Sequence, residues 1–73
     1  MALAETKDGS MRLVEIKCNL GGHTRRVFIV PDRVIALEEF GGGAATEIFV
    51  DGRPEPYWTA TSPGVVARKL RGE

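Results

Sequence analysis

The sequence has little of what disulfide-rich, membrane-spanning or nucleic-acid-coating proteins contain. Its 73 residues include one cysteine, so a scaffold held by intramolecular disulfides is excluded. Its apolar runs, such as residues 27–30, are far too short to cross a bilayer, and the N-terminus does not look like a signal peptide. Ten basic residues balance ten acidic ones, which argues against a strongly basic nucleic-acid-binding module. We therefore expect a cytoplasmic protein that does not insert into membranes.

Residues for metal binding and catalysis are also scarce. His23 and Cys18 are the single histidine and cysteine, too few for a His/Cys metal site. Cys18 alternates with polar neighbours and is expected to be a buried, small apolar residue. The adjacent Glu38 and Glu39 would point to opposite faces of a strand, so they would not act together on one substrate. We predict a protein that is not an enzyme and needs no cofactor.

Apolar and polar residues are arranged in a pattern that predicts five short strands and one helix. Gly21–Gly22, Gly41–Gly43 and Asp51–Gly52 are typical of turns between strands. The expected strands cover residues 11–19, 25–30, 34–40, 46–50 and 57–60.

The C-terminal residues change to a helical period. Ser62 and Pro63 form a helix start, and Val66 and Leu70 lie one turn apart. Basic residues of the last turn complement the helix dipole, and Gly72 ends the helix. The predicted fold class is α+β, mostly β: a small bent antiparallel sheet of about five strands, resembling half a barrel, with one short C-terminal helix. Residues 1–10 are expected to be a flexible tail, and 11–73 a single β-rich domain.

Both faces of the predicted sheet are apolar. We expect one face to carry Val14, Ile16, Val27, Ile29, Ile35, Leu37, Ile48 and Val50, and the other to carry Phe28, Val30, Val34, Phe40 and Phe49. One short helix covers only part of one face. The sheet therefore either curls into a half-barrel or is covered by a second subunit, and a homodimer is the commonest arrangement of that kind.

Aromatic residues are the candidates for this interface. Phe28, Phe40 and Phe49 have no obvious cover within the chain, and Tyr57 and Trp58 belong to residue types enriched at binding hot spots. Because Tyr57 and Trp58 are neighbours on a strand, their rings should face opposite ways. We predict an interface formed by these five residues.

Charges alternate in blocks along the chain. Residues 11–33 are net basic, residues 34–56 are net acidic, and the helix end is basic again. The candidate basic patch contains Arg12, Lys17, Arg25, Arg26 and Arg33. With Phe28 or Trp58 it could line a nucleic-acid groove, or it could complement the acidic block of a second subunit or of another protein.

The order of motifs resembles that of the small bacterial FlbD/SwrD-type proteins. Met11–Val14 and the Gly21–Gly22 turn resemble the first strand and hairpin of that family. Residues 30–39 are similar to its N-P-x-x-I-x-x-I-E-E core, residues 46–52 to its T-x-I-x-L-x-x-G strand and turn, and residues 62–66 to its helix start. The resemblance implies a role in flagellar or swarming motility and supplies no catalytic residues.

The sequence therefore predicts a non-enzymatic bacterial protein-interaction module that self-associates, with a motility-related role. The alternative is a nucleic-acid-binding regulator from a mobile element or a small operon. Retention on heparin with a steep salt dependence would favour that alternative.

Overall fold

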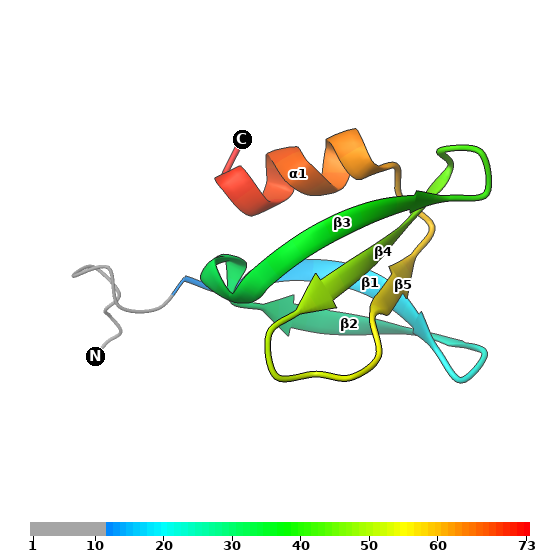
Figure 1. Cartoon of the computed structure of the whole chain (residues 1–73), viewed down its shortest axis with the longest axis horizontal. Helices are drawn as coiled ribbons and strands as arrows, with labels where there is room; N and C mark the ends of the chain where they lie inside the picture. The colour runs from blue at the N-terminus through cyan, green and yellow to red at the C-terminus, as the bar shows by residue number, and fades with distance from the viewer. Residues whose placement is uncertain (1–11) are drawn as a thin grey trace.

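The computed structural model describes residues 12–73, so the predicted tail and the first residue of the predicted domain lie outside the described residues. The elements follow the predicted order (Figure 1). They are β1 (Val14–Leu20), β2 (His23–Ile29), a 3₁₀ turn (Pro31–Arg33), β3 (Val34–Phe40), β4 (Ala45–Val50), β5 (Tyr57–Thr59) and α1 (Pro63–Arg71).

The five strands form one antiparallel sheet in the order β2-β1-β5-β4-β3. Two hairpins, β1–β2 and β3–β4, are joined by the three-residue strand β5 between them. The sheet is open, and β2 and β3 are its two edge strands. The predicted fold class, a mostly β protein with one C-terminal helix, is confirmed.

The core lies on the face of the sheet that α1 covers, which we call the inner face. Strand alternation and register place Ile16, Cys18, Ile29 and Ile48 on this face, where they pack against Val66 and Leu70 of α1. Figure 1 shows α1 lying along β3, and α1 also packs against β1 and β4. Within residues 12–73, no helix covers the opposite, outer face of the sheet.

Helix α1 begins and ends where the sequence predicts. Pro63 is its first residue, and Gly72 closes it with a φ of +85°, a conformation that favours glycine. The Gly72 N–H donates to the Lys69 carbonyl at 3.0 Å, and the Arg12 guanidinium donates to the Leu70 carbonyl. Among residues 12–73, no helix is long and apolar enough to cross a membrane.

The connection from β4 to β5 is longer than a tight hairpin. The chain does turn at Asp51 and Gly52, where the Arg53 N–H donates to the Val50 carbonyl at 3.1 Å. Pairing resumes only at Tyr57, after two prolines, because proline has no N–H to give to a sheet ladder.

The start of β3 differs from the predicted alternation. The pairing of β3 with β4 shifts between Val34 and Ala36, which leaves Ile35 as an extra residue. Val34 therefore packs against the core and Ile35 is 71% exposed, so the expected faces of these two residues were wrong. From Leu37 onward the predicted alternation holds.

Candidate functional site

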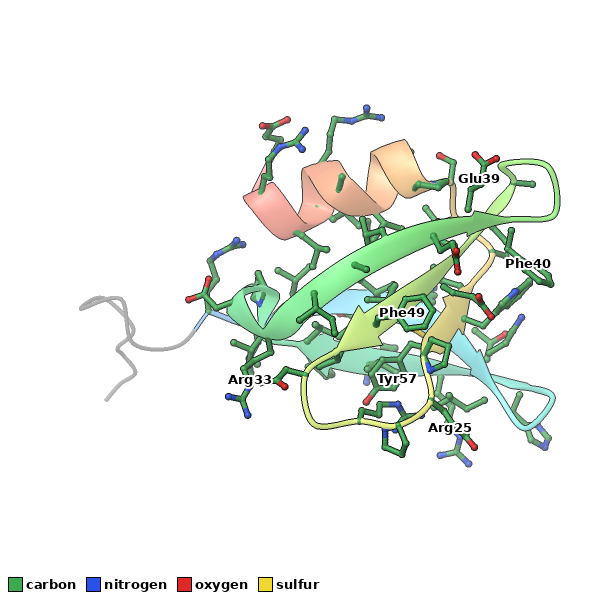
Figure 2. All side chains as sticks on the ribbon, in the orientation of Figure 1. Arg25, Arg33, Glu39, Phe40, Phe49 and Tyr57 are labelled. Atoms are coloured by element: carbon green, nitrogen blue, oxygen red, sulfur yellow. The ribbon has the colours of Figure 1, made fainter. Side chains whose placement is uncertain are left out.

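The outer face of β3, β4 and β5 carries a group of aromatic and acidic side chains that we call the aromatic face. It consists of Phe40, Phe49 and Trp58 with Glu38 and Glu47. Register places Trp58 beside Glu47, and Glu47 beside Glu38, on the same side of the sheet. The rings of Phe40 and Trp58 meet edge to face, with centroids 6.0 Å apart. Figure 2 shows Phe40 and Phe49 on this side of the molecule.

Within the aromatic face, Glu38 and Glu47 are directly opposite each other on adjacent strands. Like charges in this position repel, so a cation placed between them would be favoured. Sequence analysis considered Glu38 only with Glu39, which lies across from Thr46 on the other face. The pairing with Glu47 depends on the hairpin register and has no signal in the sequence spacing alone.

The other two candidate interface residues lie elsewhere. Tyr57 is on the inner face opposite Ile48, packs against the core, and has the Arg53 guanidinium 4.0 Å from its ring centroid. Phe28 is 54% exposed, but it lies on β2, at the far edge of the sheet from β3. The structure therefore places three of the five predicted interface residues on one face, and two of them, Phe40 and Trp58, are in contact.

The candidate basic patch is also divided. Lys17 and Arg26 are opposite each other on the outer face of β1 and β2, where Arg26 approaches Glu15 at 4.0 Å. Arg25 lies on the other face, across from Cys18. Arg33 ends the 3₁₀ turn before β3, and Arg12 binds the end of α1. The five residues thus do not line one groove.

The edge of β3 is bordered by two shallow apolar hollows. The inner hollow, of about 290 Å³, lies between β3 and α1, with Val34, Leu37 and Leu70 in its lining. The outer hollow, of about 350 Å³, includes Ile35 and Phe49. Both hollows include Ala36 and Leu37, so they flank the same stretch of the edge strand.

Cys18 is fully buried, and its burial raises the pKa of its thiol, an effect that the positive charge of Arg53 partly offsets. Its sulfur contacts the Ile16 carbonyl oxygen at 3.7 Å. In the part of the chain that the structure describes, no three His, Cys, Asp or Glu side chains are grouped so that they could hold a metal ion. Cys18 is placed as a core residue.

Comparison with protein-family models, with curated proteins and with solved structures gives no match. The resemblance to the FlbD/SwrD-type proteins therefore stays a prediction. The candidate site rests on its own geometry: a partly exposed aromatic and acidic face that continues into β3, an edge strand of the sheet formed by residues 12–73.

Proposed function

We propose that this chain is a non-enzymatic, cytoplasmic protein-interaction module that self-associates. The observation that carries the proposal is the exposure of large apolar side chains on one strand, Ile35 at 71% and Phe40 at 49% of β3. Extended apolar patches on soluble monomers are small, and larger ones mark surfaces that contact other proteins. The aromatic face and the adjoining edge of β3 form such a surface.

The chemistry of the aromatic face indicates the kind of partner that it suits. The opposed carboxylates of Glu38 and Glu47 favour a lysine or arginine from the partner, and Trp58 and Phe40 offer ring faces for a cation. A protein surface that combines apolar and basic side chains would satisfy both requirements. The five residues of the candidate basic patch lie on different parts of the fold, which gives less support to nucleic acid as the partner.

Sedimentation of the full chain tests self-association directly. The chain has a mass of 7.9 kDa, and we expect twice this mass to appear as the concentration rises from micromolar to millimolar. A sedimenting mass of one chain throughout that range would refute the proposed self-association.

The resemblance to FlbD/SwrD-type proteins adds a motility-related role to the proposal. Deleting the gene should reduce swarming or flagellar motility of the bacterium that carries it, and a plasmid copy should restore it. Unchanged motility of the deletion strain would remove this role and leave the interaction module as the proposal.

A further inference from the structure

We propose that the edge strand β3 is the contact through which two copies of this chain pair, joining their sheets into one sheet of ten strands. The inference rests on the proposed self-association and names the surface responsible. In this arrangement, β3 of one copy runs antiparallel to β3 of the other around a two-fold axis.

The first argument is that β3 has an unpartnered edge with apolar surface on both of its sides. It pairs with β4 on one side only, among the described residues. A strand added along its free edge projects side chains alternately to the two faces of the sheet. Those faces hold the inner and outer hollows that flank Ala36 and Leu37, so alternate apolar residues of the added strand would enter them.

The second argument is that β3 itself supplies such a segment. Ile35 is the most exposed large apolar side chain in residues 12–73, and it is the second residue of β3, next to Ala36. A two-fold axis near Ala36 brings this segment of each copy against the same segment of the other. Pairing would therefore cover Ile35 in both copies at once.

The third argument is charge complementarity along the strand. Arg33 and Glu39 lie three residues on either side of Ala36, and Figure 2 shows them at opposite ends of β3. Arg33 directly precedes β3 and Glu39 is near its other end, so antiparallel pairing brings the basic end of β3 in each copy toward the acidic end of β3 in the other. Neither residue takes part in an ion pair within residues 12–73.

The other edge of the sheet is less suited to pairing with itself. On β2, Arg25 and Arg26 are both exposed. Exposed cations on an edge strand discourage strand addition, and two copies of β2 would bring like charges together. Pairing of β2 with β3 of a second copy would match charges but would leave free edges that add further copies.

Sedimentation of two variants tests the assignment. Ile35→Lys places a lysine at the centre of the proposed contact, and we expect the dimer dissociation constant to rise by at least about tenfold. Leu13→Lys is the matched control, because Leu13 is also exposed, at 53%, and lies before β1. It should leave the constant unchanged, and circular dichroism should show that both variants fold.

A charge exchange separates pairing from a general loss of stability. Arg33→Glu alone should weaken the dimer by about tenfold, because it brings carboxylates together at both ends of the paired strands. Adding Glu39→Arg to it should restore the original dissociation constant. A double variant as weak as the single one would overturn the proposed antiparallel pairing of β3 with β3.

The remaining outcomes are distinguishable. An unchanged chain that stays monomeric refutes the proposed self-association and this inference with it. A dimer that Ile35→Lys leaves intact refutes the β3 contact alone and assigns pairing to another surface. Masses above two chains would also overturn the inference, because they indicate pairing of β2 with β3.

Discussion

The two edge strands of the sheet are equal in length but opposite in character. β2 and β3 each have seven residues, and each pairs with one neighbour. β2 exposes Arg25 and Arg26 at its middle, whereas β3 exposes Ile35 at its start and carries Glu38 and Glu39 toward its end. A free edge invites strand addition and exposed cations discourage it, so the pairing proposed above uses β3 rather than β2.

The same difference is visible in the alternating charge blocks of the sequence. The basic block falls largely on the β1–β2 hairpin and the acidic block on the β3–β4 hairpin, with β5 between them. A sheet with two apolar edges would add copies without limit, whereas a sheet with one protected edge would stop at a pair. Under the proposed pairing, the charge distribution would act on assembly, while the apolar alternation sets the fold.

The largest expected effect comes from the support of β3 by α1. Leu70 is nearly buried and lines the inner hollow beside β3, so Leu70→Ala should lower the free energy of unfolding by about 2–4 kcal/mol. Arg68→Ala, on the exposed side of the same helix, should change it by less than about 0.5 kcal/mol. Urea unfolding of the two variants measures the difference, and equal losses would contradict the assigned helix face.

Removing the two edge cations of β2 should increase the size of the assembly more than it affects the fold of the chain. The double variant Arg25→Thr and Arg26→Thr keeps residues that favour strands but deletes both edge cations. We expect light scattering to detect assemblies larger than a dimer, because two edges are then open to addition. The variant Lys17→Thr, on the internal strand β1, is the control and should not enlarge the assembly. A double variant that stays dimeric would show that the cations do not protect β2.

Local patterns predicted the elements and the ends of the helix well, because each depends on nearby residues. Gly72 marks the helix end by its own conformation, and Val66 and Leu70 mark the packed face by spacing. The bulge at Ile35 was missed because residues 34–37 are all apolar, so the pattern does not show which residue is extra.

The candidate site was harder to predict because it depends on strand order. Insertion of β5 between β1 and β4 places Trp58 next to Glu47, and it separates Phe28 from Phe40 by three strands. The sequence identified the aromatic residues that are candidates for an interface, but it could not show which of them share one face of the sheet. The role of each edge also becomes visible only when the order shows that β2 and β3 are outermost.

The smallest expected effect concerns the β1–β2 half of the sheet, through Cys18. Burial places the pKa of its thiol above that of the unfolded chain, which is about 8.5. As the pH rises, the unfolded chain therefore loses its thiol proton before the folded chain does. The contribution of this thiol to the free energy of unfolding is complete below about pH 8 and is lost as the pH rises through the folded pKa. Urea unfolding at about pH 7 and about pH 9.5 should show a loss of stability that Cys18→Ala reduces, since the other groups titrate alike in both proteins.

The same reduction should appear in the background of Ile35→Lys, because Cys18 lies across from Arg25 of β2, away from the β3 edge. An equal loss with and without the thiol would show that Cys18 ionises as readily in the folded chain as in the unfolded one.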